Sequence, residues 1–317
     1  MRMRPDKSNL KKSEIISELP LACSDELAAV KFLEARLWKA EPKCHHCKSS
    51  SVYQMKDVNG QRNKRFLWRC HDCKGQFTVR LGTVFEESRI PLRHWCYAFW
   101  RASTSKKGVS ALEIQRQCQI SYKSALFLMH RIRHALTPNL RRFPKLDGTV
   151  EVDETYIGGK RKFVGRGSRT GKVPVVSLLQ RGGRVRSQVM PSVTGKNLKS
   201  LVHKYVLPLS EIHTDENRGY CGVRTMYDHH TVKHAMGEYV RREKDRLVTT
   251  NSVEGYFALL KRGLNGIYHC VSKEHLHRYL GEFDFRWNTR KLNDGERTEA
   301  AIQCAQGRRL TGLQYRA

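Results

Sequence analysis

Two acidic residues occur where the sequence pattern predicts strands. Asp153 lies inside an apolar run with Val150, Val152 and Ile157, and a Gly-Gly pair ends that run, which is typical of a strand followed by a turn. A carboxylate inside such a strand costs desolvation free energy unless it is paired or binds a cation. Asp215 follows a second short strand-like stretch. Two aspartates carried by strands can hold a divalent metal ion between them.

A third candidate segment spans residues 251–261 and is predicted to be an amphipathic helix. Its apolar residues recur at helical spacing, at Val253, Tyr256, Phe257 and Leu260. Glu254 and Lys261 are seven residues apart and therefore share one face of that helix. Glu154 and Glu216 directly follow the two aspartates, so we expect them to point to the opposite face of their strands and to be structural or exposed.

Four cysteines form two Cys-x-x-Cys pairs separated by 22 residues with alternating, strand-like sequence. They are Cys44, Cys47, Cys70 and Cys73. Four thiolates arranged in this way bind Zn²⁺ tetrahedrally, and a small β-structure with little core needs such a cross-link. We therefore predict a zinc ribbon. His45, His46 and His71 are alternative ligands, and a redox role for the pairs is the alternative chemistry.

The sequence pattern of residues 110–133 predicts two helices that are joined by a turn and share a core. The expected core residues are Leu112, Ile114, Ile120, Ala125, Leu128 and Ile132. The second helix suits recognition of a DNA major groove, with Lys123, Arg131 and Arg133 as contacts; an ordinary helical hairpin is the alternative. Residues 158–172 form a glycine-rich basic loop. Its six basic residues, further candidates for DNA contacts, are Lys160, Arg161, Lys162, Arg166, Arg169 and Lys172.

The composition points to a polyanionic partner. The chain of 317 residues has 59 Lys and Arg against 30 Asp and Glu, a formal net charge of +29. Nucleic acid is the first candidate, because basic side chains that neutralise phosphates release counterions. No stretch approaches the roughly 20 apolar residues that a membrane helix needs, and the first residues resemble no signal peptide. We expect a protein of the reducing cytoplasm, at the bacterial nucleoid.

Four stretches together resemble a known family. They are Cys-His-Asp-Cys-Lys-Gly-Gln-Phe-Thr at 70–78, Leu-Gly-Thr-Val-Phe at 81–85, Glu-Val-Asp-Glu-Thr-Tyr-Ile-Gly-Gly at 151–159, and Leu-Lys-Arg-Gly-Leu-Asn-Gly-Ile-Tyr-His at 260–269. With the two aspartates, the helical Glu and the Lys, the chain resembles the RNase H-like DDE polynucleotidyl transferases. It is most similar to the insertion-sequence transposases with a zinc ribbon ahead of the catalytic domain, the ISXO2-like group.

The resemblance implies the roles of the site residues. Asp153 would bridge two Mg²⁺ or Mn²⁺ ions, Asp215 and Glu254 would each hold one, and Lys261 would meet a phosphate. Asn251 is the alternative third residue, since some relatives use Asn there. We favour Glu254, because its spacing to Lys261 matches the family and because a carboxylate binds Mg²⁺ better than an amide does. His213 and the histidines of residues 228–234 are expected to support strands or contact DNA, with a metal cluster as the alternative.

The expected fold is α/β (α+β), with a mixed-sheet RNase H-like domain preceded by a zinc ribbon and a helix-turn-helix-like region. The expected segments are a basic segment and helix (1–40), the zinc ribbon (41–85), the helical region (86–146), the catalytic domain (147–295) and a tail (296–317). A helix capped by Ser24 is expected from residue 25 to about 39.

The resemblance also implies a function and a partner. The chain would bind the terminal inverted repeats of its own insertion sequence, cleave DNA strands, and join the freed 3′-OH to target DNA. Its partner would be double-stranded DNA, both element ends and target, and a homodimer or larger synaptic assembly would hold the two ends. The alternatives are a zinc-dependent DNA-binding regulator derived from a transposase, and an RNase H-like nuclease that cleaves without joining.

Overall fold

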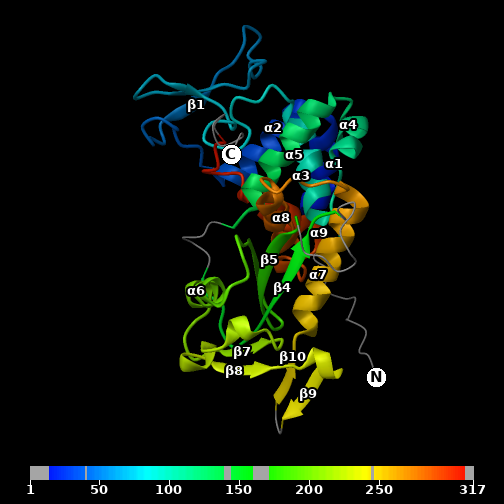
Figure 1. Cartoon of the computed structure of the whole chain (residues 1–317). Helices are drawn as coiled ribbons and strands as arrows, with labels where there is room; N and C mark the ends of the chain where they lie inside the picture. Colours follow the sequence, from blue (N-terminus) through cyan, green and yellow to red (C-terminus); the bar gives the residue numbers. More distant parts are fainter. Residues whose placement is uncertain (1–13, 40, 139–143, 160–170, 244–245, 311–317) are drawn as a thin grey trace, which may run out of the picture. The chain divides into compact units, whose positions relative to one another are not determined.

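The computed structural model describes residues 14–39, 41–138, 144–159, 171–243 and 246–310 (Figure 1). The chain divides into two compact units. Unit 1 contains the described residues of Met1–Ser105, Ala111–Ala135 and Leu292–Ala317, and unit 2 contains those of Lys106–Ser110 and Leu136–Lys291. Within the described residues, no helix combines the length and the apolar character that crossing a membrane requires.

Unit 1 is built from helices around an apolar core. The helices are α1 (Glu14–Ser24), α2 (Glu26–Trp38), α3 (Leu92–Thr104), α4 (Ala111–Cys118), α5 (Tyr122–Leu136) and α9 (Asp294–Gln303). The cap of α2 is Asp25, whose side chain accepts the N–H of Ala28 at 2.7 Å, so the prediction of Ser24 as the cap was wrong. Helix α9 begins with a capping box between Asn293 and Glu296 and packs on α1, α2 and α3, in a stretch where the sequence pattern indicated no helix.

The helix-turn-helix pattern is present in unit 1. Helices α4 and α5 are joined by a turn in which Gln119 has a φ of 53°. The predicted core residues Ile114, Ala125, Leu128 and Ile132 are each 0% exposed. Leu112 is 53% exposed, so its assignment to this core was wrong.

Unit 2 contains a five-stranded mixed sheet in the order β6-β5-β4-β7-β8. Its strands are β4 (Thr149–Ile157), β5 (Val173–Gln180), β6 (Val185–Val189), β7 (Glu211–Thr214) and β8 (Asp228–Thr231). The first three strands along the chain are antiparallel neighbours, whereas β4, β7 and β8 are parallel. This order and these directions are those of the predicted RNase H-like fold.

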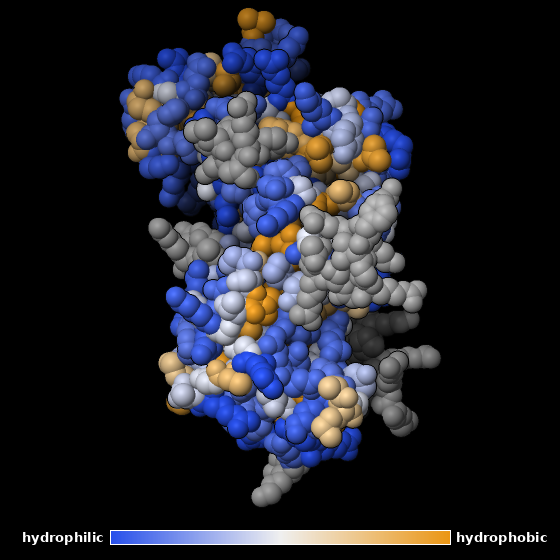
Figure 2. All heavy atoms as spheres, viewed as in Figure 1, coloured by the Kyte–Doolittle hydropathy of each residue, from blue (hydrophilic) through white to orange (hydrophobic). Residues whose placement is uncertain are grey.

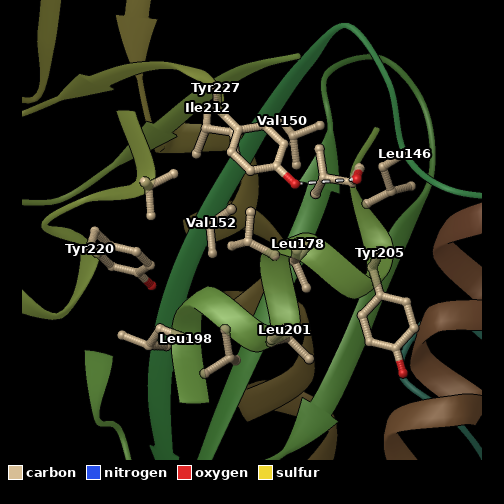
Figure 3. Close-up of a cluster of buried hydrophobic side chains, with 14 of the residues drawn as sticks. Leu146, Val150, Val152, Leu178, Leu198, Leu201, Tyr205, Ile212, Tyr220 and Tyr227 are labelled. Carbon is tan, nitrogen blue, oxygen red and sulfur yellow. Dashed lines mark hydrogen bonds between the residues drawn. The ribbon is translucent and has the colours of Figure 1, made fainter. Parts of the chain in front are cut away.

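Helices cover both faces of the sheet. On one face, α6 (Gly195–Tyr205), capped by Thr194, packs its leucines against Val150, Val152 and Ile212 (Figure 3). On the other face, α7 (Asn251–Gly263) and α8 (Leu276–Asn288) pack against Val175, Leu179 and Val185. Side chains alternate between faces along a strand, so β4 turns its valines to α6 and its odd-numbered residues to α7.

The segment between β8 and α7 holds elements that the sequence pattern did not predict. Strands β9 (Val240–Glu243) and β10 (Arg246–Thr249) form an antiparallel hairpin, and β10 leads directly into α7. Figure 2 shows that most of the visible surface is hydrophilic and that hydrophobic residues occur there in small patches. This distribution agrees with the high content of charged residues.

Candidate functional site

The two predicted aspartates meet at the end of β7, beside β4. Asp153 lies in β4, and Asp215 follows β7, the parallel neighbour of β4. Oxygen atoms of Asp153, Glu154 and Asp215 all lie within 4.8 Å of one another. In this parallel pair Glu151 is paired with His213, so Asp153 and Asp215, each two residues further along, come together although they are 62 positions apart in the chain.

This carboxylate cluster is electrostatically unfavourable when it is fully ionised. Burial raises the pKa of Asp153 to about 7; the N–H of Glu154, 2.7 Å from Asp153 Oδ1, opposes the rise, and the charges of Glu154, Asp215 and Glu254 add to it. A divalent cation relieves such repulsion. Because the donors are all carboxylate oxygens, they suit hard ions such as Mg²⁺ and Mn²⁺.

Glu154 departs from the expectation that it would point away from the aspartates. Strand alternation does place its Cβ on the α6 side of β4, yet its carboxylate belongs to the cluster. Donors near the end of β7 hold it there: the side-chain amide of Asn217, and the hydroxyl of Tyr220 at 3.0 Å. Alternation fixes where a side chain leaves the backbone, and these hydrogen bonds determine where a long side chain ends. Glu216 is exposed, as expected.

Helix α7 presents the remaining predicted residues on one polar face. Its buried residues include Val253, Tyr256, Phe257 and Leu260, as predicted. Asn251 and Lys261 are exposed. Glu254 is in the first turn, where Oε1 lies 3.1 Å from Thr250 Oγ1 and 3.3 Å from His234 Nε2. Its charge contributes to the raised pKa of Asp153, but the close carboxylate cluster in the described residues contains Glu154 and not Glu254.

The four predicted cysteines converge in unit 1. Their sulfur atoms all lie within 4.8 Å of one another, with Cys44 to Cys73 and Cys47 to Cys70 at 3.5 Å. Strands β1 (Val52–Gln54), β2 (Trp68–Cys70) and β3 (Gln76–Phe77) form the antiparallel ribbon that carries them. Four thiolates at this separation are the donor set of a structural Zn²⁺ site.

Helix α2 is part of the support of this ribbon. Glu34 accepts hydrogen bonds from Arg62 and from the indole of Trp68, the latter at 2.9 Å. Trp38 makes edge-to-face contacts with Trp68 and Phe77. His46 Nε2 lies 3.2 Å from the backbone oxygen of Gln76, in β3 of the ribbon.

Comparison with known proteins places both sites in recognised domains. The model of the transposase zinc-ribbon domain matches residues 24–76, and that of the ISXO2-like transposase domain matches residues 145–288. Together they cover more than half of the chain, including all four cysteines and the carboxylate cluster. The chain belongs to the ISXO2-like transposases. It is also 29% identical over 283 residues to an uncharacterized protein in transposable element ISH50 of Halobacterium salinarum, across 82% of this chain and 90% of that protein.

Two of the basic residues predicted to contact DNA are buried inside unit 1 of this ISXO2-like transposase. Arg131 and Arg133 are 5% and 1% exposed. Arg131 Nη1 donates to the backbone oxygens of Val84, at 2.7 Å, and Glu86. The prediction that these arginines contact DNA was therefore wrong, because the face of α5 that carries them packs inwards.

The other predicted basic contacts have different outcomes. Lys123 is exposed at the start of α5, and Lys172 is half-buried. Lys160, Arg161, Lys162, Arg166 and Arg169 lie outside the described residues.

Sequence reasoning missed a third acid on β4 of the transposase domain. Glu151 is 0% exposed and accepts hydrogen bonds from Arg181 and from the first turn of α7. One signal was available: Glu151 is two residues before Asp153, so both side chains leave the same face of one strand. His213 and His229 support the strands, through Thr249 and through Thr214 Oγ1 respectively.

Proposed function

We propose that the chain is the transposase of its own insertion sequence, which binds the terminal inverted repeats and catalyses metal-dependent DNA cleavage and strand transfer. The observation that carries the proposal is the cluster of Asp153, Glu154 and Asp215, in which crowding and burial leave acids that a divalent cation would stabilise. The family match and the relative from a transposable element support the same reaction.

Asp153 and Asp215 are proposed to hold the metal ions. A divalent cation held there supplies activation of the attacking oxygen and stabilisation of the leaving oxygen. Glu254 is the proposed third residue and Asn251 its alternative, because both lie on the first turn of α7. Glu154 competes with them for this role, since its carboxylate is already within the cluster. Lys261, two turns along α7, is proposed to contact a phosphate.

The proposed partner is double-stranded DNA, bound through the zinc ribbon and the helix-turn-helix. The net charge of +29 supports this partner, because phosphate contacts dominate non-specific affinity. Lys123 and Lys172 remain proposed contacts, together with the basic residues of 160–169. Strand transfer needs two element ends held together, so we propose that a dimer or a larger synaptic assembly acts.

The test is a Mg²⁺- or Mn²⁺-dependent assay on duplexes that carry the DNA flanking the reading frame. Wild-type protein should give joined products, and Asp153→Asn and Asp215→Asn should abolish them. Glu216→Gln is the matched control, because it neutralises an exposed acid beside Asp215. Cleavage without joining would instead identify a nuclease, and binding with neither activity a regulator.

The same assay assigns the third residue. Among Glu254→Gln, Glu154→Gln and Asn251→Ala, we expect Glu254→Gln to cause the greatest loss of joined products. A greater loss in either other variant would transfer the role to that residue.

A further inference from the structure

The first turn of α7 is held by an acid 101 residues earlier in the chain. Glu151 Oε2 accepts the N–H groups of Ser252 and Val253, at 2.8 and 3.1 Å, and Oε1 accepts the hydroxyl of Ser252 at 3.0 Å. The first N–H groups of a helix have no partner within it, and a negative charge is favourable at that end. Thr250, at the N-cap position, turns its hydroxyl to Glu254, so Glu151 supplies the cap.

Arg181 joins this carboxylate to the strand that leads into α7. Its Nε and Nη2 lie 3.1 and 3.0 Å from Glu151 Oε1. Nη1 donates to the backbone oxygen of Leu247 at 2.8 Å, and Nη2 to that of Thr249 at 3.2 Å. One guanidinium thus connects β4, through Glu151, to β10 immediately before α7.

His213 connects the same point to β7. Its Nδ1 lies 3.2 Å from the backbone nitrogen of Thr249 and 3.1 Å from Arg181 Nη2, and both of those atoms are donors. Nδ1 also lies 3.3 Å from the backbone oxygen of Thr249. Nε2 lies 3.0 Å from Glu211 Oε1, a carboxylate oxygen that accepts, so Nε2 carries a proton and donates to Glu211. The ring is fully buried, which fixes its orientation.

The strand register places these contacts directly beside the aspartates. Glu151 on β4 is paired with His213 on β7. Two residues further along each parallel strand, in the same direction, come Asp153 and Asp215. Two residues of strand span about 6.6 Å. Glu151 and His213 therefore lie about this distance from Asp153 and Asp215 along the strand direction.

We propose that Glu151, Arg181 and His213 form a positioning clamp that sets α7, and with it the third residue of the site, over the Asp153–Asp215 pair. This proposal rests on the proposed function. Stability alone is a weak reason for the arrangement, since a buried ion pair often stabilises a fold no better than apolar side chains of similar volume. The clamp instead ties three separate segments, β4, β7 and β10–α7, at the level where their functional residues must meet.

The test compares Glu151→Gln with Glu282→Gln in the full-length protein. Glu282 is a matched control, because it is also 0% exposed and paired with an arginine, Arg286, but lies on α8. For Glu151→Gln we expect single-turnover cleavage of the flanking duplex to slow by about 100-fold, the cost of misplacing a reacting group by about 1 Å, with DNA affinity unchanged. Both variants should lower the melting temperature by a similar amount. Glu282→Gln should leave the cleavage rate within about threefold of the wild-type rate. Equal rate losses in the two variants, or an unchanged rate in Glu151→Gln, would overturn the clamp.

Hydrogen exchange of the Ser252 and Val253 amides provides a readout that does not depend on activity. We expect Glu151→Gln to accelerate exchange there by about tenfold, and Glu282→Gln to leave it unchanged. If Glu151→Gln fails to fold, Glu151→Asp replaces it, since the shorter side chain keeps the charge but reaches the amides poorly. If wild-type protein neither cleaves nor joins the duplex, the proposed function fails. Hydrogen exchange of the Ser252 and Val253 amides then tests by itself whether Glu151 holds the first turn of α7. Unchanged exchange in the Glu151 variant would then refute the clamp.

Discussion

Replacing Asp153 with Asn should stabilise the metal-free protein at neutral and alkaline pH. Asn has nearly the same shape as Asp but carries no charge, so the substitution removes one member of the crowded cluster without emptying the space. Glu154 and Asp215 remain as neighbours. The variant therefore isolates the electrostatic cost of holding an ionised Asp153 at this position.

The size of the effect follows from the pKa of Asp153. Burial, with the neighbouring carboxylates adding to it, raises that pKa from 3.8 to about 7. Because the folded-state pKa is the higher one, the stability contributed by this group is full below pH 3.8 and is lost as the pH rises through about 7. One pKa unit is worth about 1.4 kcal/mol, so ionised Asp153 costs the folded state at most about 4 kcal/mol.

Chemical denaturation of both proteins between about pH 4 and pH 8, with a chelator present, measures this difference. We expect the two free energies of unfolding to agree at about pH 4 and to diverge as the pH rises. In thermal denaturation at about pH 8, this difference corresponds to a melting temperature up to about 10 °C higher for Asp153→Asn. Added Mg²⁺ or Mn²⁺ should stabilise wild type and not the variant. Glu216→Gln should follow the wild-type curve. Parallel wild-type and Asp153→Asn curves over this range would refute the reasoning.

Three further predictions concern unit 1. Cys70→Ser should release zinc and unfold the ribbon, because Cys70 is fully buried among the four thiolates; a zinc-release assay with circular dichroism checks this, and retained zinc would contradict it. Arg131→Ala should lower the free energy of unfolding by about 3 kcal/mol, since it removes the donor to the buried carbonyl of Val84 and the part-buried carbonyl of Glu86, and should leave DNA affinity unchanged. Lys123→Ala should weaken DNA binding at low salt and reduce the slope of log K against log salt by about 0.9; an unchanged slope would remove Lys123 from the interface.

The parts of the site that could be predicted are those with a local signal. Asp153 disrupts an otherwise apolar strand, the α7 residues repeat at helical spacing, and the paired cysteines have the spacing of metal ligands. Each pattern lies within one segment of the chain: a strand, a helix or the ribbon. The structure accordingly brings Asp153 and Asp215 together and gathers the four cysteines.

The parts that could not be predicted depend on contacts between distant segments. Glu151 meets Ser252 across 101 residues, and no periodicity within either segment reveals that contact. Arg131 was predicted to be accessible to DNA, because a helix-turn-helix pattern does not show which face of its second helix is buried. Glu154 was expected to point away, because strand alternation does not describe how far a flexible side chain reaches.

The geometry of the acids and the proposed clamp are physically linked. Repulsion between Asp153, Glu154 and Asp215 tends to separate β4 from the segment after β7, so something must hold the cluster closed. On one face, the packing of Val150 and Val152 against α6 does so; on the other, the contacts of Glu151 do. A scaffold that resists this repulsion keeps the oxygen atoms close before any cation arrives. A bound cation then gains the full relief of the repulsion, and none of its binding free energy is spent on drawing the strands together.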